Sequence, residues 1–242
     1  MQGTQVVNGT TKNVYQLKEP GLSLDVQNLV DGTSAVLSDG RRVTLITTAL
    51  NYTLMGLWIV SSNAVPDTVY WGLGISGYQT PTSGVPTSGS ATYVSGAPGS
   101  SPNSGLVSPT TGGVYGLVFV PSGSLVVTGD IRGQASVNVN FATANVTGSL
   151  TSMTSSIAGL DTAPVPWNSV ALAGNLTGAT VQGTTSVTTA PTDLLALGSG
   201  ATGTFTGALF GPNAKELGAS WNLYDPAGNG KTAIGVLGAI AP

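Results

Sequence analysis

Cysteine and histidine are both absent from this 242-residue sequence. Without them the chain cannot build a Ser-His-Asp or Cys-His nucleophile pair, a thiolate or imidazole zinc site, or a histidine-ligated haem. It also forms no disulfides, which suits an exported bacterial protein better than a small eukaryotic secreted scaffold. Because only carboxylate, lysine and tyrosine chemistry remains, we expect no enzyme activity, no metal and no cofactor.

Charge is equally scarce. Asp, Glu, Lys and Arg make up 7% of the residues, and 7 basic against 10 acidic side chains leave a net charge of −3. An average soluble domain is roughly 25% charged. Such a weak field cannot hold phosphates or anionic lipid, so the sequence predicts no nucleic-acid partner. The surface must instead be rich in hydroxyl and amide groups.

Long hydrophobic runs are missing too. The longest, Leu54–Val60 and Ala233–Ala241, are far shorter than the roughly 20 residues that span a bilayer, so no membrane-spanning segment is predicted. The residues after Met1 also lack the basic and apolar regions of a signal peptide. We therefore expect a mature or recombinant form, with any export signal or membrane attachment outside these residues.

What is present is a β-strand pattern, in a chain that is 40% hydrophobic and can bury a real core. Gln134–Phe141 alternates without a break between apolar and polar residues, as in a strand with one buried face. The segment Asp193–Leu197 is at most one helical turn, and no sustained helical period occurs. Further strands are predicted at Val114–Val120, Leu125–Ile131, Asn145–Ser152, Val170–Leu176, Thr180–Thr188, Thr202–Phe210, Glu216–Leu223 and Thr232–Leu237.

Eight or nine short antiparallel strands would expose edges to other chains unless the sheet closes on itself. The sequence therefore predicts an all-β protein with a C-terminal eight-stranded antiparallel barrel. A smaller β-rich region precedes it, with hairpins predicted at Asp31-Gly32 and Asp39-Gly40. We divide the chain into a handle-like region at 1–76, a Pro/Gly/Ser/Thr-rich joint at 77–113 that carries one barrel strand at Ser90–Val94, and the barrel at 114–242. Either a flexible linker or an ordered crossover fits the joint.

Two segments, Gly77–Gly96 and Gly203–Trp221, carry a family resemblance. In the later segment, a strand rich in glycine and aromatic residues runs into a Gly-Pro-x-Ala-x-Glu turn and then into the next strand. Together the two segments resemble the barrel of the transferrin-binding protein B family, across roughly Gly77–Gly238. Ala219 stands where that family usually has a second glycine. The signature residues are Gly203, Phe205, Gly207, Phe210, Gly211, Pro212, Ala214, Glu216 and Gly218.

This resemblance implies an exported bacterial protein of the outer-membrane surface or the extracellular space, with a variable N-terminal handle before the barrel. Ligands in the family include host iron proteins, complement regulators and haem. The residues that contact them differ among branches, so the resemblance assigns no contact residue here. The scarcity of lysine argues against capture of a host protein through charge, and the lack of histidine argues against haem transport.

Four motifs in the sequence are candidates for binding or catalytic sites. Gly72-Leu-Gly74-Ile-Ser-Gly77 spells a dinucleotide-binding pattern, but the proline at position 81 prevents the helix that such a site needs, so a glycine-rich turn is expected. Glu216 is expected to accept backbone N–H groups and lock its hairpin, since a glycosidase needs two carboxylates. The segment Asp225–Lys231 is read as a hairpin loop rather than a calcium site. Crowded aromatic residues form either a binding surface or the N-terminal core: Trp58, Tyr70, Trp71 and Tyr78.

Two functions fit these observations. In the first, a surface protein binds a partner protein or a small-molecule ligand through loops on the barrel. In the second, the chain is a structural subunit of an extracellular filament or layer that self-associates through low-charge β surfaces, with a flexible Met1–Val14 arm completing a neighbour's sheet.

Overall fold

The computed structural model describes residues 3–62, 69–96, 106–157, 163–227 and 230–242. Over these ranges the chain is all-β, with 17 strands, three single-turn 3-10 helices and no α-helix, which confirms the predicted fold class. None of the helices in these ranges is long and apolar enough to cross a membrane. The chain forms two compact units: residues 1–47 with 56–72, and residues 48–55 with 73–242.

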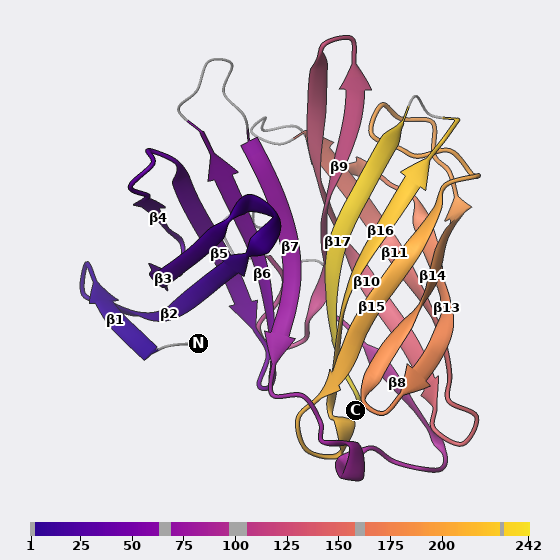
Figure 1. The fold of residues 1–242 in the computed structure, drawn as a ribbon. Helices are drawn as coiled ribbons and strands as arrows, with labels where there is room; N and C mark the ends of the chain where they lie inside the picture. The colour runs from indigo at the N-terminus through magenta and orange to yellow at the C-terminus, as the bar shows by residue number, and fades with distance from the viewer. Residues whose placement is uncertain (1–2, 63–68, 97–105, 158–162, 228–229) are drawn as a thin grey trace. The chain divides into compact units, whose positions relative to one another are not determined.

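The second unit holds a closed antiparallel barrel whose circumference is eight strands (Figure 1). It closes where the last strand pairs with the first, with Gly238 opposite Gly113 and Thr232 opposite Phe119. The closed circuit leaves no long edge open to other chains. Its strands are β9 (Gly113–Ser122), β10 (Leu125–Asn140), β11 (Asn145–Ile157), β13 (Ser169–Thr177), β14 (Thr180–Thr189), β15 (Thr202–Phe210), β16 (Glu216–Asp225) and β17 (Lys231–Ile240).

One position in this circuit is shared by two strands. The strand β8 (Ser90–Val94), at the residues expected from the sequence, pairs with the second half of β10, from Ser136 to Asn140. β9 pairs with the first half of β10, up to Gly133. Between the two strands, Gly96 donates its N–H to Thr111 O (2.9 Å). β8 and β9 together therefore pair with most of the length of β10.

Two strands predicted at Leu125–Ile131 and Gln134–Phe141 are one continuous strand, β10. The glycine between them, Gly133, does not make a turn. It lies at a bulge in the pairing with β11, and the Met153 side chain occupies the space that a Cβ at position 133 would need. A bulge increases local twist while the strand continues, as a small barrel requires. Merging the two predicted strands gives eight in the circumference.

The barrel interior is a packed core. Alternate residues of each strand point inward, as the period-two pattern of β10 predicts, and Ile131, Val137 and Val139 are fully buried. The rings of Trp167 and Trp221 approach within 6.3 Å between centroids. Because side chains fill the lumen, the barrel wall acts as a rigid support for its loops.

A loop between β14 and β15 closes one end of the barrel; we call residues 193–198 the plug. Leu195 and Leu197 are buried in the core cluster, and the Trp167 indole donates to Leu195 O (2.9 Å). As expected from the sequence, the segment contains no helix. The fully buried Asn168 accepts from Leu197 N (2.7 Å) and donates to Leu197 O (2.8 Å) and Thr189 O (3.0 Å).

Charged side chains also hold the plug. The Asp225 carboxylate accepts from Gly198 N (2.6 Å), and Lys231 Nζ donates to the carbonyls of Leu194 (2.9 Å) and Ala196 (2.8 Å). Asp225 and Lys231 lie opposite each other in the register of the β16–β17 hairpin, which confirms the hairpin predicted for this segment. Positions 228 and 229 of that segment lie outside the described residues.

The remaining strands form two small sheets that correct two expectations. Asp31-Gly32 does not close a hairpin, because the strands on either side belong to different sheets and Gly32 donates to Leu45 O (2.8 Å). The expected flexible arm is a hairpin that turns at Asn8-Gly9, where both residues have positive φ. The predicted hairpin at Asp39-Gly40 is confirmed. The strands are β1 (Gly3–Val7), β2 (Thr10–Glu19) and β3 (Leu24–Val30) in one sheet, and β4 (Thr33–Val36), β5 (Arg42–Ala49), β6 (Thr53–Ser61) and β7 (Val69–Gly77) in the other.

Short elements complete the chain. The 3-10 turns are η1 (Pro20–Leu22), η2 (Thr82–Gly84) and η3 (Pro212–Ala214), and β12 (Val165–Pro166) extends the edge of β11. Gly72, Gly74 and Gly77 lie within β7, so the expected glycine-rich turn is a strand. The three-part division at residues 76 and 113 stays a prediction.

Candidate functional site

The signature residues build the hairpin β15–η3–β16 at the end of the barrel opposite the plug. Inward-facing Gly203 and Gly207 let neighbouring strands approach closely, because a Cβ at either position would collide with the backbone of β16. Phe205 and Phe210 are buried, the former within the core cluster of the barrel. The glycines and aromatic residues of the signature are therefore explained by packing.

The Gly211-Pro212 turn has a conformation that only glycine adopts without strain. Gly211 has φ 76° and ψ 176°, and the Tyr52 ring covers the space where a side chain would begin. Its N–H donates to Tyr78 O (2.8 Å), and its carbonyl accepts from Thr80 Oγ1 (2.7 Å). The segment at 78–80 thus fastens the turn, which explains why the two resembling segments occur together.

Glu216 is fully buried, and its carboxylate binds a distant part of the chain. Oε1 accepts from Asn51 N (2.9 Å), while Oε2 accepts from Tyr52 N (3.0 Å) and Thr53 N (2.8 Å). The sequence correctly predicted an acceptor of backbone N–H groups, but the donors belong to the residues at the start of β6 rather than to its own hairpin. Because all three donors converge on one carboxylate, Glu216 fixes residues 51–53 to the barrel.

The four aromatic residues predicted as a binding surface or core do not form one cluster. None is fully buried, and Tyr70 and Tyr78 are 44% and 73% exposed. The Trp58 ring lies over Gly72 on β7, the face that also carries Tyr70, whereas Trp71 points to the opposite face. A single surface made of all four is therefore not formed, and a binding role for the individual residues stays a prediction.

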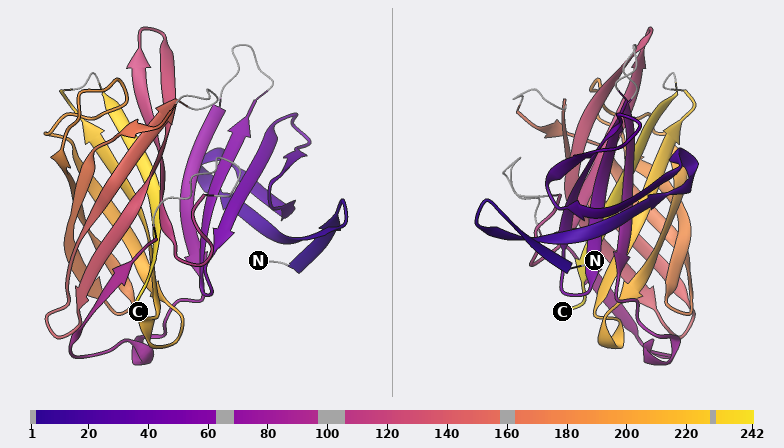
Figure 2. Two further views of the ribbon diagram at one scale, coloured as in Figure 1. Left: turned by 180° about the vertical axis from the view of Figure 1, so that it is seen from behind. Right: turned by 60° about the vertical axis from the view of Figure 1, so that its left-hand side comes forward.

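Four exposed apolar side chains lie at the plug end of the barrel, a set that the sequence did not predict. The β9–β10 hairpin extends beyond the pairing with β11 and β17 and projects past the barrel (Figures 1 and 2). Its tip carries Leu125 and Val126, 73% and 59% exposed. Leu194 of the plug and Tyr224 at the end of β16 are also more than half exposed. We call Leu125, Val126, Leu194 and Tyr224 the plug rim.

A signal for the rim is present in the sequence. Three consecutive apolar residues, Leu125–Val127, follow the turn at Gly123-Ser124, and a strand cannot bury all three on one face. No charged residue occurs between Val114 and Gly129. Exposed apolar residues on a hairpin without charged side chains are typical of surfaces that contact other molecules.

Across the part of the chain that the structure describes, no group of three acidic residues lies close enough to hold a metal ion. Its one ion pair joins Arg41 and Asp39 (2.7 Å) on the surface, where the Arg41 hydrogen bond lowers the pKa of Asp39. On the barrel wall, Tyr115 donates to Asp130 (2.8 Å), and burial raises the pKa of Tyr115. These groups stabilise strands and do not converge on a cleft.

Closure, the plug and the signature hairpin define an eight-stranded antiparallel barrel with a filled lumen. The family model of the C-lobe and N-lobe β-barrels of Tf-binding protein B matches residues 85–241. The chain belongs to this family.

Solved structures agree in fold. A double mutant of transferrin-binding protein B from Haemophilus parasuis Hp5 has a TM-score of 0.56 and 17% identity, covering 99% of this chain and 40% of its own. Intact Ap-TbpB, with its N and C lobes, has a TM-score of 0.51 and 15% identity, covering 100% and 42%. The chain thus spans about two fifths of the solved proteins it matches. No curated protein matches it in sequence.

Proposed function

We propose that this chain is a non-catalytic protein of the bacterial surface or extracellular space that binds a partner protein through the plug rim. The observation that carries the proposal is the exposure of apolar side chains at one end of a rigid barrel, most of all Leu125 and Val126. The solved relatives are named for binding transferrin, which makes transferrin the first partner to test.

The composition of the rim specifies how the contact works. Tyr224 is an aromatic residue of the kind enriched at interface hot spots, and Leu125 and Val126 add exposed apolar surface that a partner can bury. The net charge of −3 provides little electrostatic steering. Binding should therefore depend on apolar burial and change little with salt.

Replacing both residues of the hairpin tip, Leu125→Ser with Val126→Ser, should weaken transferrin binding by about tenfold to a hundredfold, because two apolar anchors are lost. Surface plasmon resonance with immobilised full-length chain, at low and high salt, measures the change. The matched control replaces two equally exposed valines elsewhere, Val6→Ser with Val36→Ser, and should bind as the parent does. Equal binding by the tip variant would contradict the role of the rim, and no binding by the parent would contradict transferrin as partner.

A structural subunit is the second candidate, and one observation favours it. The edge strand β1 carries no charge or proline, four of its five residues are exposed, and Val6 is 66% exposed. Edge strands without such protection pair readily with other chains. Sedimentation velocity over a wide concentration range separates the two functions, since a chain that stays monomeric throughout does not assemble through β1.

A further inference from the structure

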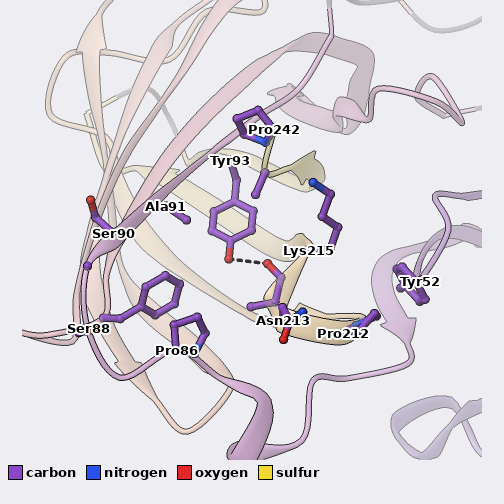
Figure 3. A pocket seen from close by; sticks show the side chains of 14 residues that line it. Tyr52, Pro86, Ser88, Ser90, Ala91, Tyr93, Pro212, Asn213, Lys215 and Pro242 are labelled. Carbon is purple, nitrogen blue, oxygen red and sulfur yellow. Dashed lines mark hydrogen bonds between the residues drawn. The ribbon is translucent and has the colours of Figure 1, made fainter.

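A hollow of about 610 Å³ opens at the end of the barrel opposite the plug (Figure 3). The turn η3, the start of β8 and the residues after β17 surround it, and all of them belong to the barrel unit. Its size lies within the range of small-molecule sites. The signature residues Pro212 and Ala214 line part of it, whereas the plug rim lies at the opposite end of the barrel.

The wall of the hollow is mostly apolar. Tyr93 stands at its centre in Figure 3, with Pro86 on one side and Asn213 on the other. Phe141, Ala91 and Ala241 line it and pack against the barrel core. Rings and prolines present flat surfaces, so the wall suits a flat apolar body.

The lining also contains polar groups. Ser88, Ser90 and Asn213 can donate and accept hydrogen bonds, and Lys215 is the one lining residue with a charged side chain. Within the described ranges Lys215 has no ion pair. The neighbouring carboxylate of Glu216 is fully buried and accepts three backbone N–H groups instead. The exposed ammonium of Lys215 therefore suits an anionic group on a ligand.

The site is held in place before any ligand arrives. Tyr93 donates its hydroxyl hydrogen to Ala214 O (2.7 Å), and burial raises the pKa of Tyr93 to about 12, so the hydroxyl remains a donor. Asn213 and Ala214 both have φ 55°, a left-handed conformation that is costly for alanine. A wall fixed in this way loses little entropy when a ligand binds.

We propose that this hollow binds a small aromatic monocarboxylate, with the ring against Pro86 and Phe141 and the carboxylate beside Lys215. The site is separate from the plug rim, so a small ligand and a partner protein would occupy opposite ends of the barrel. Neither proposal depends on the other.

The test uses the full chain and two probes of nearly equal shape, indole-3-acetate and the neutral indole-3-acetamide. Titrations followed by ¹H–¹⁵N NMR should show saturable shifts for the amides of Ala91, Asn213 and Lys215 with the acetate. We expect binding of the acetamide to be about five- to tenfold weaker, since it lacks the charge that pairs with an exposed lysine.

Three variants separate charge from shape. Lys215→Met should weaken the acetate to the level of the acetamide and leave the acetamide unchanged. Ala91→Leu, which places a larger side chain in the hollow, should abolish binding of both probes. Lys18→Met removes an exposed lysine from the other unit and should change nothing. Shifts that do not saturate, shifts confined to the plug rim, or equal acetate affinity in Lys215→Met would each overturn the proposal.

Discussion

Replacing Glu216 by alanine should lower the free energy of unfolding of the barrel unit by about 3–5 kcal/mol. The substitution removes the acceptor of three backbone N–H groups, those of Asn51, Tyr52 and Thr53. Glu216 is fully buried, so water does not readily replace the lost acceptor. Each buried donor left without a partner costs about 1–3 kcal/mol, and the three share one site.

Urea denaturation followed by tryptophan fluorescence measures this loss, because Trp221 lies in the barrel core. Glu19→Ala is the matched control: it removes the other glutamate, whose carboxylate accepts one backbone N–H, from Gly21, at the surface. Its cost should stay below about 1 kcal/mol. Glu216→Gln keeps the shape but turns an amide NH₂ toward backbone donors, and it should fall between the two. A cost for Glu216→Ala no greater than the control's would show that the three hydrogen bonds contribute little.

Replacing Asn168 by leucine should release the plug, at a cost of about 3 kcal/mol. The side chain is fully buried and joins Leu197 and Thr189 by three hydrogen bonds. Leucine has a similar volume, so it fills the space but leaves two carbonyls and one N–H without partners. The loss should be local, because the strands keep their own pairing.

Hydrogen exchange measures this local opening. The amide of Leu197 should lose protection in Asn168→Leu, whereas amides in the centre of β10 keep theirs. Asn138→Leu serves as the control, since Asn138 makes its one side-chain bond to Thr92 on the exposed face. If Leu197 exchanges at the same rate in both variants, Asn168 does not hold the plug.

The sequence predicted the barrel well because its pattern is local. Alternation along β10 directly reports which side chains face the core, and the strand at Ser90–Val94 has the predicted bounds. Errors came where glycine has two meanings. Gly133 lies in a bulge of one strand that was predicted as two, and Gly74 lies in a strand that was predicted as a turn. Propensity alone does not separate these uses, because each depends on a neighbouring side chain or strand.

The candidate sites were harder to predict, since they depend on contacts between distant segments. The acceptor role of Glu216 followed from its turn, but its donors lie more than 160 residues earlier. Similarly, exposure of Leu125 follows from how far its hairpin outreaches β11 and β17, which is a property of register. The aromatic residues predicted as one group lie on opposite faces of β7, because neighbouring positions 70 and 71 of a strand point apart.

The way the barrel closes has a consequence for how it folds. The barrel closes only when β9 pairs with β17, with Gly113 opposite Gly238 and Gly116 opposite Gly235. During translation β9 is synthesised long before β17. One edge of β9 therefore stays unpaired until most of the other barrel strands have been made. Closing so long a loop is entropically costly and slow. During that interval the growing sheet has two open edges that can pair with other chains.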